Sequence, residues 1–279
     1  MSSAAAARLR ALLEARLGAW PGAIEHFETL GSTSDHLRSR AREGAPQWSV
    51  ALADEQTAGR GRHGRSWVSP RGGLYLSVLL RPDLPAERGA LLPLAVAVAA
   101  CEAVDELGLR AQIKWPNDLV IGDRKLGGIL VEATSDGARL ESAIIGIGIN
   151  LELGEDERAL PPELRRASAS LRAETGRAVA PVDAAAAVLA RLTAWYAALG
   201  RDERGRMLSA WRERSASWWG STVEVRCGES VLRGTARDID DRGALLLDLP
   251  DGSTVALLSG DARELSRALS RPERAEPPA

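Results

Sequence analysis

The pattern of apolar and polar positions predicts a chain in which strands and helices alternate. Residues 74–81 (LYLSVLLR) form a predicted strand, which the turn residues PDLP then end. Residues 88–107 are apolar nearly all round, so we expect a buried helix there. The same patterns predict further strands at 47–54, 111–115, 118–121, 125–133 and 142–151, and further helices at 4–17, from 31 onward, and at 162–174, 182–199 and 201–218. We therefore expect an α/β (α+β) fold in the first part of the chain, with a mixed sheet flanked by helices.

The pattern changes near residues 218–220 (WWG). Four short segments with alternating polarity follow, separated by turn residues: TVEVRC, VLRGTARDID, ALLLDLP and STVALLS. This spacing predicts a small antiparallel β-barrel. We accordingly divide the chain into a first domain at 1–217, a small barrel at 218–266 and a disordered tail at 267–279.

Charge and composition narrow the function and the compartment. The formal net charge of -2 and the pI of about 6.0 argue against general attraction to polyanions. The two cysteines, Cys101 and Cys227, and the three histidines lack metal-ligand spacing, which suits a reducing cytosol and argues against a disulfide framework. The longest apolar run, 90–101, is too short to span a bilayer, and the N-terminal sequence lacks a secretory signal. We expect a cytoplasmic protein that does not associate with membranes.

Lysine and asparagine are rare in this sequence. Of 36 basic residues only Lys114 and Lys125 are lysines, and the only asparagines are Asn117 and Asn150. Where lysine is so rare, each one is expected to be needed for its compact ammonium, which the flat guanidinium of arginine cannot replace. All four residues lie between 114 and 150, so we expect a site there.

The segment EQTAGRGRHGRSW (55–67) matches the pattern G-x-G-x-x-G. A dinucleotide-binding turn requires a helix after the glycines, whereas a strand is predicted here, so we reject that interpretation. The crowding of Arg60, Arg62 and Arg65 favours a bound anion, because like charges at this density repel one another. Arginine suits bidentate contact with phosphate or carboxylate, and glycine allows a loop to close over a ligand. A flexible surface hairpin tip is the alternative.

The segment QIKWPNDLVIGDRKLGGILVE (112–132) contains a Gly-Asp pair that suits a two-residue hairpin turn. In that register Val120 faces Lys125, and Asp118 faces Gly127. Asp118 and Lys125 would then lie on one face of the sheet, about 7–8 Å apart or less at Cβ, close enough to share a ligand for which Gly127 leaves room. An ordinary cross-strand salt bridge is the alternative.

The segment IIGIGINL (144–151) places Gly146, Gly148 and Asn150 on one face of a strand and apolar side chains on the other. A face of bare backbone suits the close approach of a flat ligand, although glycine in a strand can also mark a bulge or tight packing.

In GSTSD (31–35), Ser32 and Asp35 resemble a capping box. We therefore expect at least one of these hydroxyls to cap a helix, with a ligand role for the others secondary.

Several motifs occur in a fixed order along the chain. They are GSTS (31–34), EQTAGRGRHGRSW (55–67), GGLYLSVLLRP (72–82), KWPNDL (114–119), RKLGGILVE (124–132) and GIGINL (146–151). Together they resemble the biotin protein ligases, also called biotin–(acetyl-CoA-carboxylase) ligases, over roughly residues 20–200 and the C-terminal barrel. The resemblance implies a catalytic domain like the core of class II aminoacyl-tRNA synthetases, followed by a small Src-homology-3-like β-barrel.

The resemblance also implies a two-step reaction. The carboxylate of biotin attacks the α-phosphate of ATP to give biotinyl-5′-AMP and pyrophosphate, and a lysine of a biotin carboxyl carrier protein then attacks the mixed anhydride and releases AMP. ATP and biotin are substrates, and no tightly bound prosthetic group is implied. Mg²⁺ is expected to bind with ATP, mostly through phosphate and water, so no dedicated protein cage is expected.

The family's functional residues can be carried over only where this sequence matches the motifs. Arg60 and Arg62 are implied to bind the biotin carboxylate and the phosphates, and Lys125 to align carboxylate against α-phosphate. Asp118 is implied to orient the carrier lysine or to receive its proton. The positions that match biotin contacts are Ser32, Thr33, Ser34, Gln56, Arg60, Gly61, Arg62 and Lys125. The positions that match nucleotide contacts are Arg62, Arg65, Trp67, Lys114, Asn117 and Asn150.

The implied partner is a biotin carboxyl carrier protein, and no nucleic-acid partner is expected. Some family members repress transcription through an N-terminal winged helix-turn-helix, but only about twenty residues precede the match here, too few for that domain. Predicted strand edges could serve a homodimer or carrier docking, and the sequence does not choose between them. A lipoate–protein ligase, or a non-enzymatic biotin-responsive regulator, is the alternative. The chain lacks the RRxxGGGxVxHD-type stretch that is typical of lipoate ligases.

Overall fold

The computed structural model describes residues 3–152 and 162–266, so the predicted tail at 267–279 lies outside the described residues. The strands of the larger sheet are β1 (Ile24–Phe27), β2 (Val50–Ala53), β3 (Leu74–Leu80), β4 (Gln112–Lys114), β5 (Asp118–Ile121), β6 (Arg124–Ser135) and β7 (Leu140–Ile149). Those of the smaller sheet are β8 (Thr222–Cys227), β9 (Ser230–Ile239), β10 (Leu245–Asp248), β11 (Thr254–Leu257) and β12 (Asp261–Ser266). The helices are α1 (Ala4–Leu17), α2 (Thr33–Arg42), α3 (Leu92–Glu106), α4 (Pro162–Ala167), α5 (Leu171–Thr175), α6 (Pro181–Gly200) and α7 (Arg204–Arg214).

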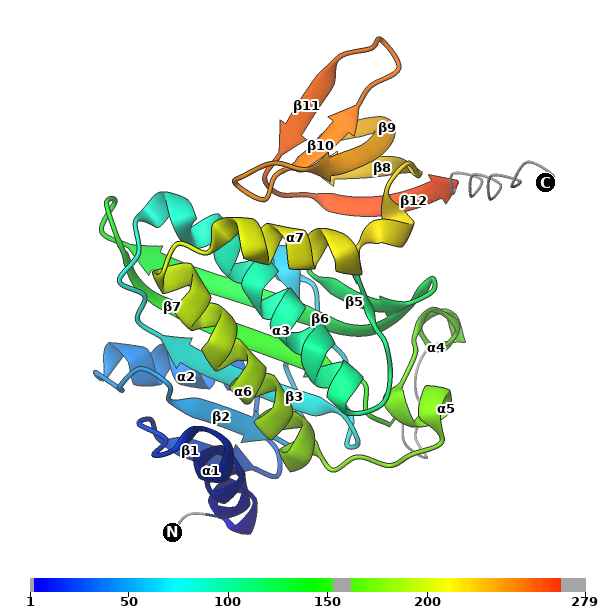
Figure 1. The fold of residues 1–279 in the computed structure, drawn as a ribbon. Helices are drawn as coiled ribbons and strands as arrows, with labels where there is room; N and C mark the ends of the chain where they lie inside the picture. Colours follow the sequence, from blue (N-terminus) through cyan, green and yellow to red (C-terminus); the bar gives the residue numbers. More distant parts are fainter. Residues whose placement is uncertain (1–2, 153–161, 267–279) are drawn as a thin grey trace, which may run out of the picture.

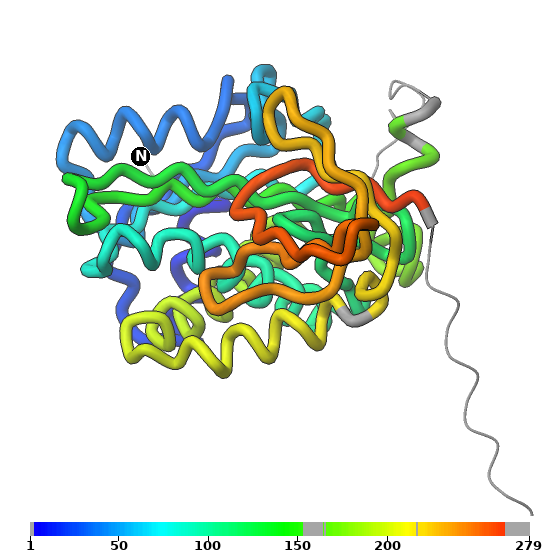
Figure 2. Tube along the Cα trace, turned by 90° about the horizontal axis from the view of Figure 1, so that it is seen from above, coloured from blue at the N-terminus to red at the C-terminus, as the bar shows by residue number. Residues whose placement is uncertain are grey.

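The larger sheet is mixed and has helices on both faces (Figure 1). Its strand order is β1-β2-β3-β7-β6-β5-β4, in which β1 and β2 are parallel and the other pairs antiparallel. Figure 2 shows α2 on one side of this sheet and α3, α6 and α7 on the other. This arrangement, with a separate small β-domain after it, matches the predicted fold class.

Side-chain alternation explains why the two faces differ. On β3 the even positions, such as Leu76 and Val78, enter the main core beneath α3 and α6. The odd position Leu79 packs with Leu37 of α2 in a small second cluster. The α2 face therefore carries little apolar cover, and polar groups can line the rest of it.

One helix within the described residues, α6, has the length and hydropathy of a membrane span, with a mean hydropathy of 1.3. Its apolar residues pack against α1, α3 and β3, as those of a core helix do.

Most of the predicted elements are confirmed, and the differences have local causes. The helix predicted at 162–174 is split into α4 and α5, because Ser168 bridges to Lys125 of β6 and Ser170 caps α5. The helix predicted at 201–218 ends at Arg214, and a short 3₁₀ helix follows. Both strands that were missed, β1 (IEHF) and β12 (DARELS), are short and polar, and pairing with a neighbour rather than their own pattern determines them.

The small domain packs directly against the first domain (Figure 1). Arg212 of α7 donates hydrogen bonds to Asp238 and to the carbonyl oxygen of Ile239, both at 2.7 Å. The indole of Trp115 lies 3.4 Å from the carbonyl oxygen of Gly243, whose tight turn contacts α3. These contacts join β9 and the turn at Gly243 to the first domain.

Candidate active site

The start of α2 provides the first group of predicted site residues. The Oγ of Ser32 accepts a hydrogen bond from the backbone N of Asp35 at 3.4 Å, so Ser32 caps the helix as expected. The carboxylate of Asp35 does not complete a capping box, because it pairs with Arg60 at 2.9 Å.

Hydrogen bonds between side chains join the start of α2 to β3. The backbone N and the Oγ1 of Thr33 both donate to Oε1 of Gln56, at 2.9 and 3.1 Å, and Nε2 of Gln56 donates to Ser69 at 2.9 Å. The hydroxyls of Thr33 and Ser34 lie 2.8 and 3.0 Å from the hydroxyl of Ser77, which is fully buried. Ser77 was missed from the sequence, although a single hydroxyl within the apolar run LYLSVLL was a usable signal. These groups form a small polar pocket with both donors and acceptors.

The glycine face predicted for β7 is present on the α2 side of the sheet. A Cβ on Gly146 would lie 2.7 Å from the Oγ of Ser34, and a Cβ on Gly148 would lie 2.7 Å from the indole of Trp67. A Cβ on Gly128 of β6 would lie 3.2 Å from the same indole. The flat group that lies on the bare backbone is thus the side chain of Trp67 itself. Among the described residues its buried Nε1 has no hydrogen-bond partner.

A β-bulge in β6 corrects part of the predicted hairpin register. Val120 does pair with Lys125, but Asp118 pairs with Gly128 rather than with Gly127. One extra residue on β6, Leu126, causes this shift. Gly127 therefore faces the core and gives no room to a ligand, and Gly128 lies beside Lys125 instead.

Lys125 and Asp118 lie on one face, as predicted, and form an ion pair with 2.7 Å between Nζ and Oδ1. The ammonium also lies 5.1 Å from the centroid of the Trp67 ring. Asn150 fixes the backbone here, since its Nδ2 donates to the carbonyl oxygens of Lys125 and Ala169 at 3.3 and 3.0 Å. The ammonium is thus held on a well-supported strand next to a carboxylate and an aromatic face.

The glycine-rich loop, residues 59–66, is attached to the sheet at its start through Arg60. This guanidinium lies 2.8 and 3.0 Å from the two carboxylate oxygens of Glu132 on β6. Arg38 of α2 pairs with both Glu132 and Asp35, which completes a cluster of four charges. Burial opposes the charge of Arg60, but the two carboxylates outweigh it and raise the pKa of the guanidinium. The guanidinium of Arg60 is thus paired with two carboxylates in this structure.

The second half of the loop is attached to the small domain. Nη1 of Arg62 lies 3.2 Å from Oδ1 of Asn117 and 3.1 Å from the carbonyl oxygen of Gly260, and Arg65 pairs with Asp261. Burial lowers the pKa of Arg62, although the nearby Asp261 opposes this effect. A three-residue 3₁₀ helix, not an α-helix, follows Gly61, so the rejection of a dinucleotide-binding turn is confirmed.

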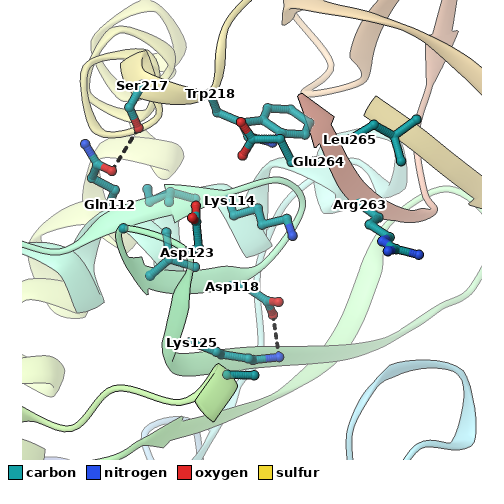
Figure 3. A pocket seen from close by; sticks show the side chains of 14 residues that line it. Gln112, Lys114, Asp118, Asp123, Lys125, Ser217, Trp218, Arg263, Glu264 and Leu265 are labelled. Carbon is teal, nitrogen blue, oxygen red and sulfur yellow. Dashed lines mark hydrogen bonds and ion pairs between the residues drawn. The ribbon is translucent and has the colours of Figure 1, made fainter. Parts of the chain in front are cut away.

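Lys125 lines three cavities, to which we give names. The hydroxyl pocket has a volume of about 50 Å³, and its lining includes Ser32, Thr33, Ser34, Gln56, Gly61 and Lys125. The indole pocket has a volume of about 190 Å³, and its lining includes Trp67, Tyr75, Lys125, Asn150 and Ser168. The interdomain groove has a volume of about 590 Å³, and its lining includes Lys114, Asp118, Lys125, Trp218, Arg263 and Glu264 (Figure 3). The structure therefore brings predicted residues of α2, β5 and β6 into cavities that share Lys125, with Lys114 in the groove.

No group of three or more histidine, cysteine, aspartate or glutamate side chains that could hold a metal ion occurs within residues 3–152 and 162–266.

Comparison with known proteins agrees with this geometry. Residues 27–150 match the model of the biotin/lipoate A/B protein ligase family, and residues 219–262 match that of the biotin protein ligase C-terminal domain. The chain is 34% identical over 278 residues to the biotin–(acetyl-CoA-carboxylase) ligase of Mycobacterium tuberculosis, which covers 92% of this chain and 95% of that protein. It is 34% identical over 232 residues to the bifunctional ligase/repressor BirA of Bacillus subtilis, which covers 81% of this chain and 70% of that protein.

A solved structure supports the same relationship. The biotin protein ligase from Aquifex aeolicus in complex with biotin and ATP superposes with a TM-score of 0.71 at 27% identity, covering 87% of this chain and 99% of that one. Sequence and architecture agree across both domains. The chain belongs to the biotin protein ligase family.

Proposed function

We propose that this protein activates biotin with ATP as biotinyl-5′-AMP and transfers the biotinyl group to a lysine of a biotin carboxyl carrier protein. One observation carries the proposal: Lys125 lines three cavities at once. A reaction that joins an acid to a nucleotide and then to an amine needs such a meeting point, because the reacting groups must be held close together and correctly oriented.

The hydroxyl pocket would hold the ureido ring of biotin. Thr33, Ser34 and Gln56, with Ser77 behind them, offer donors and acceptors that a cyclic urea can use and that the dithiolane of lipoate cannot. At about 50 Å³ the pocket is far smaller than the roughly 300–1,000 Å³ of typical ligand sites, so biotin binding must displace the indole of Trp67. This displacement would release a buried Nε1 that lacks a partner.

Lys125 and Arg62 would supply the positive charge for adenylation. The carboxylate of biotin and the triphosphate repel each other, and fixed cations near the α-phosphate offset that repulsion as charge develops in the transition state. Lys125 would align the carboxylate oxygen for attack on phosphorus. The adenine would occupy the indole pocket, between Trp67 and the strand end that Asn150 fixes.

In the second step the carrier amine attacks the carbonyl carbon of the mixed anhydride, and AMP leaves with the bonding electrons. Asp118 lies 2.7 Å from Nζ of Lys125, where it could orient the incoming amine and accept its proton. Mg²⁺ would enter bound to ATP and be held by phosphate oxygens and water, since the described residues bring no three metal ligands together.

The cellular role follows from the same proposal. The partner would be the carrier domain of a biotin-dependent carboxylase in the cytoplasm. The formal net charge of -2 does not favour DNA binding, which argues against a repressor role.

The decisive experiment is incubation with ATP, Mg²⁺ and biotin, followed by mass spectrometry. Biotinyl-AMP should form, and an added carrier domain should gain the mass of one biotinyl group. A parallel reaction with lipoate tests the alternative acid. Transfer of lipoate in the absence of biotinyl-AMP would reject the assignment in favour of a lipoate ligase, and formation of neither adenylate would favour a non-enzymatic role.

A further inference from the structure

Arg38 of α2 is a charged residue to which the proposed function gives no part. It lies one turn after Asp35 and pairs with both Asp35 and Glu132 of β6. These are the same two carboxylates that bind Arg60 of the glycine-rich loop. The sharing extends to single atoms, because Oδ1 of Asp35 and Oε2 of Glu132 each accept hydrogen bonds from both guanidinium groups. Two cations and two anions thus form one neutral cluster.

Arg60 belongs to a short hairpin that covers the hydroxyl pocket. The backbone N of Gly61 donates to the carbonyl oxygen of Arg65 at 2.7 Å. The backbone N of Trp67 donates to the carbonyl oxygen of Gly59 at 2.9 Å. Arg60, Gly61 and Trp67 all line the hydroxyl pocket. Since the backbone bonds join the two arms of the hairpin, an opening that lifts Trp67 off the pocket also draws Arg60 away from its carboxylates.

The free energy of this opening depends on what Arg60 leaves behind. Without another cation, the carboxylates of Asp35 and Glu132 would remain close together as unpaired like charges, which is unfavourable. Arg38 prevents this, because it bridges both carboxylates and stays on α2 when the loop moves. In the closed state it acts in the same direction, since its charge repels that of Arg60 and it occupies two of the oxygens that Arg60 binds.

A bracing role for Arg38 would have the opposite sign. If Arg38 only held Asp35 and Glu132 in position for Arg60, its removal would loosen the cluster and the loop would open more often. The contacts favour the first effect, because Arg60 orients both carboxylates by itself through hydrogen bonds of 2.8, 2.9 and 3.0 Å.

We propose that Arg38 is a positioning residue that promotes opening of the glycine-rich loop, by keeping Asp35 and Glu132 neutralised when Arg60 leaves them. Arg38 itself lines none of the three cavities around Lys125, so it acts through Arg60. The inference rests on the proposed function for the ligands concerned. It makes Arg38 control how fast biotin enters the hydroxyl pocket and how fast biotinyl-AMP leaves it.

The test is NMR measurement of hydrogen exchange at Nε1 of Trp67, on the full chain without ligands. This nitrogen is buried and has no hydrogen-bond partner among the described residues, so its proton exchanges when the loop opens. Its signal is assigned by its loss in Trp67→Phe. Exchange should be roughly threefold to tenfold slower in Arg38→Gln, the range expected for partly exposed charges. Arg38→Met removes the same charge and should slow exchange equally.

Two further variants separate charge from other effects. Arg38→Lys keeps the charge and should restore exchange close to the wild-type rate, and exchange as slow as in Arg38→Gln would contradict an electrostatic cause. Arg42→Gln is the matched control, since Arg42 is an exposed arginine at the last residue of α2, outside the three cavities. It should leave exchange at Trp67 unchanged. Thermal melts of all variants check that each is folded.

A kinetic measurement distinguishes this inference from the proposed function. Association of biotin and dissociation of biotinyl-AMP should both slow in Arg38→Gln by about the same factor as exchange. If the wild type forms biotinyl-AMP but exchange at Trp67 is equal or faster in Arg38→Gln and Arg38→Met, this inference is wrong and the proposed function stands. If the wild type forms no biotinyl-AMP yet exchange slows in both variants, the proposed function is wrong and the part of Arg38 in loop opening stands.

Discussion

Glu132 is expected to control how long an adenylate stays in the site, because it holds the glycine-rich loop closed through Arg60. The Glu132→Gln substitution keeps the size of the side chain but removes its charge and one accepting oxygen. Contacts of 2.8 and 3.0 Å between Glu132 and Arg60 are then weakened together, while the contact of 2.9 Å between Arg60 and Asp35 remains. The loop should therefore open more often without being released completely.

The size of this effect follows from the exposure of the pair. A hydrogen bond between charged groups contributes about 1.5–3 kcal/mol when it is protected from water. The side chains of Arg60 and Glu132 are 35% and 29% exposed, so solvent screening lowers that value. About 1–2 kcal/mol remains for loop closure, which corresponds to a change of about 5–30-fold in the closed-to-open ratio.

The assay measures release of the intermediate. Biotinyl-AMP is formed on the enzyme, free nucleotide is removed by rapid gel filtration, and the adenylate that dissociates is followed over time. Release should be about 5–30-fold faster from Glu132→Gln than from the wild type. The control is Glu43→Gln, which breaks an ion pair of 2.7 Å with Arg40 at the far end of α2. Equal release from the wild type and both variants would show that Glu132 does not hold the loop.

Three further predictions test other parts of the site. Lys125→Arg should slow formation of biotinyl-AMP about tenfold or more, because a flat guanidinium cannot replace a compact ammonium; an initial rate near that of the wild type would contradict this role. Ser77→Ala should lower the free energy of unfolding in urea by about 1–3 kcal/mol, since Thr33 and Ser34 lose a buried partner, and an unchanged midpoint would argue against the network. Burial raises the pKa of the Cys101 thiol from 9.0 to about 12. The stabilisation that comes from keeping this thiol protonated in the folded state is therefore complete below about pH 9 and is lost as the pH rises toward 12. The melting temperature should fall over that window less steeply in Cys101→Ala, and parallel curves for the two proteins would contradict this contribution.

The pairing of Asp118 with Lys125 shows how far the sequence could predict the site. A Gly-Asp turn and two flanking strands were sufficient to place both side chains on one face. The bulge at Leu126 was not predictable, because it depends on packing of both sheet faces rather than on a local motif. As a result the glycine beside Lys125 is Gly128 and not Gly127.

The partners of the loop arginines could not be predicted from the sequence either. The crowding of arginines in the loop predicted an anion near Arg60, and the anions found there are the carboxylates of Glu132 and Asp35. These two residues come from separate elements that only the fold brings together. The same holds for Ser77 of β3, whose fully buried hydroxyl lies within hydrogen-bond distance of the hydroxyls of Thr33 and Ser34. Local patterns thus identified the groups that bear the chemistry, whereas tertiary packing determined which of them are already paired.

The attachment of the glycine-rich loop to the small domain has a thermodynamic consequence. Arg62 and Arg65 connect this loop to the turn that contains Gly260 and Asp261. Coupling free energy between two sites is reciprocal, so if a ligand held by the loop favours docking of the small domain, docking must raise the affinity for that ligand by the same factor. A carrier that docks on the small domain would accordingly change the residence time of the very intermediate it consumes.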